Sequence, residues 1–203
     1  MPAARFAASA VTQGEGEKVM RSIVSIVAFA MATSAAAVDV EGVKLDDKAS
    51  VGGQELVLNG AGVRSRAVFK VYVGSLYVPA KATTLAAVLE KAPRRFQLNI
   101  LRSLSSDQLI DALSDGLKDN TSAEELAAIK PQVDQLVATM KSLGDVKEGD
   151  VVTLDFVDGA TKIALNGAAK GSIAGDPFNP ALTRIWLGDK PAQVDLKKAM
   201  LGG

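Results

Sequence analysis

Apolar and polar residues alternate over much of the first half of the chain, as they do in β-strands with one buried face. Short alternating runs lie at 43–45 and 54–58. The strongest run is 69–78, where β-branched and aromatic residues are dense, and Pro79 ends it. Residues 96–100 alternate once more. These runs predict neighbouring strands of one sheet.

The middle of the chain changes to a helical period. An S-x-x-Q sequence at 105–108 and an S-x-x-E sequence at 122–125 are capping boxes, which mark helix starts. Apolar residues at helical spacing follow the first box, and a longer apolar stripe spans 126–143. We expect Pro131 to bend that second helix and Gly144 to end it. The stripe itself is the pattern of ordinary core packing.

Shorter helices are predicted before and after this region. Thr83 or Thr84 can cap a helix that ends before Pro93. Pro177 lies in the first turn of a helix whose apolar face includes Trp186. Asp189 can cap a last helix at the C-terminus. We expect Trp186 to be a core residue between this terminal helix and the sheet, with a place in a cleft wall as the alternative.

Two hairpin signals, Asp158-Gly159 and Asn166-Gly167, divide a β-prone segment into a meander. Its predicted strands are 151–157, 160–165 and 168–174. The strands are not separated by regularly alternating helices, so a parallel sheet is excluded. The sequence predicts an α+β fold, a mainly antiparallel sheet with helices over one face.

Composition narrows the possible chemistry. The chain has 203 residues and 48% hydrophobic content, enough for one domain with a sizeable core. It contains no histidine and no cysteine, which removes Ser-His and Cys-His nucleophiles, disulfides and the usual transition-metal ligands. Lys+Arg and Asp+Glu are equal at 23 each, so no net field attracts nucleic acid. We therefore expect no metal, no cofactor and no nucleic-acid partner.

The N-terminal segment has the features of an export signal. An uncharged apolar run from 22 to 37 follows Arg21 and ends in three alanines, which fit a cleavage site. We expect residues 1–37 to be a signal peptide, with Met20 as an alternative start, and 38–203 to be a periplasmic domain. A membrane anchor or a buried helix is the alternative. The run is shorter than the roughly 20 apolar residues of a bilayer span, and no membrane span is expected after cleavage.

Arg64 has the most constrained setting of all the cations. It follows Gly60 and Gly62, in a glycine-rich stretch that predicts a bend between two strands. An arginine held there should point across the sheet rather than into solvent. Its function would be to bind an anion, and the alternative is a sheet-edge arginine paired with a nearby carboxylate.

Two segments resemble a known family. LNGAGVR followed by FKVYVGSLYV, together with the late GDPFNPALTRIWLGDKPAQVDLKKAMLG, is similar to the chalcone isomerase-like proteins, and most closely to their exported bacterial branch. The resemblance covers nearly all of 38–203. It implies an open-faced β-sandwich, with a large antiparallel sheet, helices packed over one face and a ligand cleft between them.

The resemblance also implies site residues. Arg64 occupies the position of the arginine that handles the negative oxygen of the ligand, and Tyr72 corresponds to a ligand-binding position in fatty-acid-binding members. For Tyr72, a core role with a satisfied hydroxyl is the alternative. Ser105 and Ala112 stand where the enzymes of the family have a tyrosine and an asparagine. No catalytic residue is assigned.

These observations favour a non-catalytic periplasmic protein that binds a fatty-acid-like or other amphipathic anion through Arg64. The alternatives are an intramolecular lyase that uses Arg64 to stabilise a phenolate, and an interaction protein with a vestigial cleft. Chalcone turnover distinguishes the lyase from the other two. Copurified lipid distinguishes a binding protein from an interaction protein.

Overall fold

The computed structural model describes residues 37–90 and 92–203. Their main feature is a seven-stranded antiparallel sheet whose strands follow one another in chain order. The strands of this sheet are β3 (Lys48–Val51), β4 (Gln54–Arg66), β5 (Phe69–Val78), β6 (Arg94–Ile100), β7 (Val151–Val157), β8 (Ala160–Leu165) and β9 (Ala168–Ala174). A separate hairpin comes before them, formed by β1 (Val38–Val40) and β2 (Val43–Leu45).

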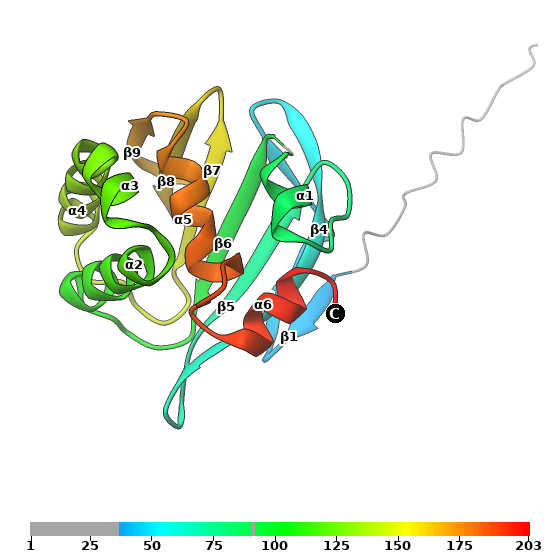
Figure 1. Ribbon diagram of the computed structural model, residues 1–203. Coiled ribbons are helices and arrows are strands. Elements are labelled where there is room, and N and C mark those ends of the chain that lie inside the picture. The colour runs from blue at the N-terminus through cyan, green and yellow to red at the C-terminus, as the bar shows by residue number, and fades with distance from the viewer. Residues whose placement is uncertain (1–36, 91) are drawn as a thin grey trace, which may run out of the picture. The chain divides into compact units, whose positions relative to one another are not determined.

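The helices pack over one face of the curled sheet (Figure 1). They are α1 (Leu85–Leu89), α2 (Ser106–Asn120), α3 (Ala123–Ala128), α4 (Lys130–Leu143), α5 (Phe178–Leu187) and α6 (Val194–Met200). Helices α2 to α4 form the connection between β6 and β7, and α5 and α6 follow the last strand. The α+β fold with helices over one face of an antiparallel sheet, predicted from the sequence, is confirmed.

Strand β5 shows how the sheet separates two cores. Leu76 and Val78 belong to the large core under the helices, while Val73 and Tyr77 belong to a smaller one on the other face. This division follows from the side-chain alternation of a strand. The smaller core also contains Leu45 of β2, so the first hairpin covers part of the face that the helices leave open.

The glycines before Arg64 have a different role from the one predicted. Gly60 and Gly62 lie inside β4, which continues through them as one strand with a register shift near Leu58. Neither has a positive φ angle. A methyl group at Gly62 would lie 2.8 Å from Cβ of Ala199, and one at Gly60 would collide with the Ala199 carbonyl group. These glycines therefore allow α6 to pack directly on the strand.

Two helix boundaries also differ from the prediction. The apolar stripe at 126–143 does not belong to one bent helix, because α3 ends at Ala128 and α4 begins at Lys130 with Pro131 in its first turn. Proline fits the first turn of a helix because no intrahelical partner is needed for its nitrogen. Asp189 does not cap the last helix, whose N-cap residue is Gln193.

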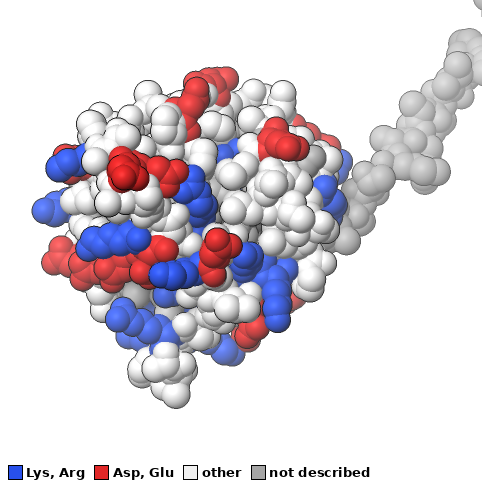
Figure 2. All heavy atoms as spheres, in the orientation of Figure 1, with Lys and Arg blue, Asp and Glu red and all other residues white. Residues whose placement is uncertain are grey.

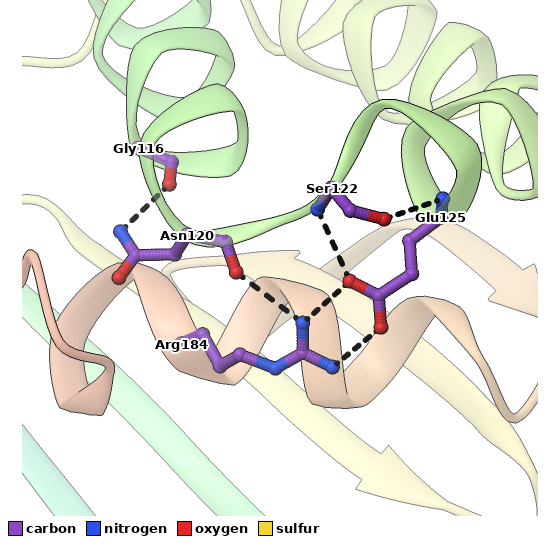
Figure 3. Close-up of polar contacts among 5 residues, drawn as sticks. All are labelled: Gly116, Asn120, Ser122, Glu125 and Arg184. Carbon is purple, nitrogen blue, oxygen red and sulfur yellow. Dashed lines mark hydrogen bonds and ion pairs between the residues drawn. The ribbon is translucent and has the colours of Figure 1, made fainter.

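The two capping boxes are present as predicted, and the second joins a larger polar network (Figure 3). Arg184 of α5 donates to both carboxylate oxygens of Glu125, at 3.1 and 3.3 Å, and to the carbonyl oxygen of Asn120 at 3.3 Å. The Glu125 carboxylate also accepts from the backbone N–H of Ser122. Hydrogen bonds from Arg184 are the main cause that lowers the pKa of Glu125. This network ties the end of α2 and the start of α3 to α5.

Candidate functional site

A cavity of about 330 Å³ lies between the sheet and helices α2, α4 and α5. Its wall is largely apolar. The apolar side chains from the sheet and the connecting segments are Ala67, Phe69, Val71, Leu98, Leu104, Val152, Leu154 and Ala192, and those from the helices are Leu109, Ala112, Leu113, Met140, Leu143, Ile185 and Trp186. Clefts of this size and lining are typical of small-molecule sites.

Arg64 lines this cavity from β4. Its NH1 donates to the carbonyl oxygen of Ala192 at 3.3 Å, which points the guanidinium group toward the segment before α6. Nε of Arg64 is buried and has no hydrogen-bond partner in the described part of the chain. Among the residues that the structure describes, no carboxylate forms an ion pair with Arg64, so the predicted alternative of a paired sheet-edge arginine is not seen there.

Tyr72 lies directly opposite Arg64 in the antiparallel pair of β4 and β5. Side chains at directly opposed positions share a face of the sheet and have Cβ atoms about 4.5–5.5 Å apart. The two predicted ligand-binding residues are therefore neighbours, and both line the cavity. They are brought together by the two-residue turn between Arg66 and Phe69 together with a register shift after Arg64.

The Tyr72 hydroxyl is held by Trp186. Nε1 of Trp186 donates to the Tyr72 oxygen at 2.9 Å, and the indole ring stacks on Phe96 with the ring centroids 5.0 Å apart. Burial raises the pKa of Tyr72, against the opposing effects of the Arg64 charge and the Trp186 hydrogen bond. The hydroxyl thus keeps its proton at neutral pH. Within the described chain no residue accepts that proton, so Tyr72 can donate to a ligand oxygen.

Trp186 is both a core residue and part of the cavity wall, the two positions considered for it from the sequence. Its side chain is 2% exposed and packs in the large core, and it also forms part of the cavity wall. For Tyr72 the core alternative is correct in that the hydroxyl oxygen has an internal partner. Trp186 donates to the Tyr72 oxygen, so the hydroxyl hydrogen of Tyr72 is not used by this contact.

Two further arginines border the cavity, and the sequence interpretation did not assign them to it. Arg66 of β4 and Arg102, which follows β6, are both exposed and both line the cavity. The Arg102 guanidinium carbon lies 4.6 Å from the ring centroid of Phe69. No aspartate or glutamate is among the described lining residues. The period of two in a strand could have identified Arg66, because it puts residues 64 and 66 on one face.

The positions at which the enzymes of the family have polar side chains are occupied differently here. Ser105 accepts a hydrogen bond from the Gln108 backbone as the N-cap of α2 and does not line the cavity. Ala112 does line it, with a methyl group only. Gln108 is the one polar lining residue from α2 among the described residues. The arrangement offers hydrogen-bond donors for an anion and no carboxylate or imidazole for proton transfer.

The chain combines an antiparallel sheet, helices over one face and a largely apolar cavity that is bordered by arginines. The sequence matches the chalcone isomerase-like family over residues 37–202, and the chain belongs to that family. A search of curated proteins finds no match. Among solved structures, the chain is similar to a fatty-acid binding protein of Arabidopsis thaliana. The TM-score is 0.60 at 12% sequence identity, over 79% of this chain and 92% of that chain. At this identity the similarity shows the fold.

The expected signal peptide, residues 1–37, lies outside the described residues except for its last one. In the described part of the chain, no helix is both long and apolar enough to cross a membrane.

Proposed function

We propose that the protein is an exported, non-catalytic binding protein for a fatty-acid-like amphipathic anion. The observation that carries the proposal is the pair of free donors at the cavity. Among the residues that the structure describes, Nε of Arg64 has no partner, and the Tyr72 hydroxyl beside it has none for its proton. Buried cations need an anionic or hydrogen-bonding partner, and a carboxylate can accept from both groups at once.

The apolar wall supports a hydrocarbon tail as the rest of the ligand. The cavity of about 330 Å³ holds on the order of ten methylene-sized groups, if each occupies about as much volume as a water molecule, roughly 30 Å³. A medium-chain fatty acid matches this size. The fatty-acid binding protein of Arabidopsis with a similar fold adds support, because it shows that this architecture can accommodate such a ligand.

A titration with an acid and its ester tests the proposal. Trp186 is the only tryptophan and lines the cavity, so its fluorescence should change when a ligand enters. We expect decanoate to bind, and methyl decanoate to bind at least about tenfold more weakly, because charge-assisted hydrogen bonds contribute about 1.5–3 kcal/mol each. Mass spectrometry of the purified protein should find fatty acid. Equal affinity for acid and ester would refute an anion site.

Export is the second part of the proposal and has its own test. The apolar run and the three alanines at 35–37 support cleavage after Ala37. We expect the secreted protein to begin at Val38 and to be found in the periplasm. N-terminal sequencing after fractionation measures both. A cytosolic protein with an intact N-terminus would contradict export and would leave the ligand site unaffected.

Chalcone cyclisation is expected not to exceed the spontaneous rate. Arg64 and Tyr72 could stabilise a phenolate, but Ser105 is occupied as a helix cap and Ala112 has no polar group. The measurement is the absorbance of a hydroxychalcone over time with and without the protein. A robust rate that is lost in Arg64→Ala would favour the lyase instead.

A further inference from the structure

The turn between β4 and β5 exposes apolar side chains. We define the hairpin tip as residues 66–70, which project beyond the neighbouring elements at the lower end of the sheet (Figure 1). Val68 is 88% exposed and Phe69 is 56% exposed. Val68 is the most exposed large hydrophobic residue in the part of the chain that the structure describes. Two adjacent apolar side chains with this exposure make the turn a candidate interaction site.

Basic side chains surround the hairpin tip. Arg66 and Lys70 flank the turn, and Arg102 stacks on Phe69. The sequence has no acidic residue between Glu55 and Glu90. The carboxylate that does contact the tip belongs to Glu41, which forms an exposed ion pair with Lys70 at 2.5 Å. Figure 2 shows Lys and Arg side chains next to the uncharged projection at the lower end of the molecule.

The hairpin tip also borders the cavity. Arg66, Ala67 and Phe69 line it, together with Arg102. Val68 does not line it, and its side chain is exposed. The apolar tip, its basic neighbours and the cavity opening are therefore on one end of the sheet.

We propose that the hairpin tip docks on a bilayer surface that contains anionic lipids. Val68 and Phe69 enter the headgroup region, and Arg66, Lys70 and Arg102 contact the lipid phosphates. The cavity then opens toward the membrane, which is where an amphipathic ligand is available. Uptake of a ligand from the membrane into the cavity would rest on the proposed function, whereas docking on the membrane does not. Basic residues close to a surface of anionic lipids are attracted to it, and apolar side chains add to binding.

A bilayer fits this surface better than a protein partner does. Stable protein interfaces bury about 800 Å² on each partner. The hairpin tip offers two large apolar side chains, Val68 in the turn and Phe69 at the start of β5. This is too little for such an interface but enough for shallow insertion between lipid headgroups. Its charge also complements an anionic surface. Arg66, Lys70 and Arg102 lie at the tip, and the described carboxylate that contacts it is that of Glu41.

Vesicle flotation with matched variants tests the proposal. The full chain is mixed with vesicles of phosphatidylcholine, or of phosphatidylcholine and phosphatidylglycerol in equal parts. We expect binding to the anionic vesicles, and Val68→Ser should weaken it roughly fivefold. Val194→Ser is the control, because Val194 is 57% exposed at the start of α6 and is not one of the residues of the hairpin tip. Residues 1–36 are common to all variants, so their contribution cancels in the comparison.

A lysine pair tests the electrostatic part. Lys70→Gln should weaken binding to anionic vesicles roughly fivefold. Lys48→Gln should not, although Lys48 has a similar exposed ion pair, with Glu55 at 2.7 Å near the other end of β4. Added salt should reduce the difference between wild type and Lys70→Gln.

Solution binding of decanoate separates this inference from the proposed function. Val68→Ser should keep wild-type affinity for decanoate, because Val68 does not line the cavity. Equal vesicle binding by wild type, Val68→Ser and Val194→Ser would overturn the docking surface even if decanoate binds. A tip that captures a protein partner while wild type ignores both kinds of vesicle would also overturn it. Tip-dependent vesicle binding without decanoate binding would support docking and refute the proposed ligand.

Discussion

Arg64→Gln is expected to weaken decanoate binding at least about tenfold and to change the affinity for methyl decanoate little. The acid gains charge-assisted hydrogen bonds from the guanidinium group, each worth about 1.5–3 kcal/mol, and the ester does not. Glutamine keeps a polar side chain of moderate length at the position, so the hydrogen bond toward Ala192 can be replaced in part. Calorimetric titration of both ligands against both proteins measures the difference.

Arg66→Gln is the control on the same strand. Arg66 is also a cavity-lining arginine, but its side chain is exposed, and charges in contact with water contribute less. We therefore expect a smaller loss that added salt diminishes, whereas the loss in Arg64→Gln should persist in salt. If Arg64→Gln lost acid and ester binding equally, Arg64 would be a structural residue. Thermal unfolding of each variant shows whether the fold is intact.

Several elements could be predicted to the residue because their signals are local. The meander at 151–174 is an example, since Asp158-Gly159 and Asn166-Gly167 take positive φ angles at both positions of each turn. Turns of this kind set the register of the strands on either side. The capping boxes are equally local, because the residues that satisfy each other are three positions apart.

Features that depend on distant contacts could not be predicted in this way. Two closely spaced glycines predict a bend at Gly60 and Gly62. The true reason for them, close packing against Ala199 of α6, lies about 140 residues further along the chain and leaves no local signal. The stripe at 126–143 has helical spacing throughout, although α3 ends before Ile129 and α4 begins after it. A break between two helices that share a core leaves little trace in the hydrophobic period.

In the candidate site, too, the features with local signals could be predicted and those that depend on distant contacts could not. The sequence indicates Arg64 and Tyr72 as site residues, but their direct opposition depends on a register shift after Arg64 as well as on the short hairpin. The hydrogen bond from Trp186 to Tyr72 joins residues 114 positions apart, and the one from Arg64 to Ala192 spans 128. These contacts orient the Arg64 guanidinium group and the Tyr72 hydroxyl. Residue types and spacing alone contain no information on such a pairing.

Ala112→Trp is expected to abolish measurable decanoate binding while the protein stays folded. Ala112 is exposed on α2 and lines the cavity, so a larger side chain there can extend into the opening without displacing the core. An indole group fills much of a space that holds on the order of ten methylene groups. The change leaves Arg64 and Tyr72 in place, so a loss of binding would come from the tail pocket alone.

Ala127→Trp is the matched control for this substitution, because Ala127 is an exposed alanine of α3 that does not line the cavity. It should bind decanoate as wild type does, and both variants should unfold within a few degrees of wild type, since a surface substitution usually changes stability by less than about 0.5 kcal/mol. Calorimetric titration and circular dichroism provide the two measurements. If Ala112→Trp bound decanoate as tightly as Ala127→Trp, the tail would lie outside this cavity, and the anion at Arg64 would have to be the head of a ligand that stays on the surface.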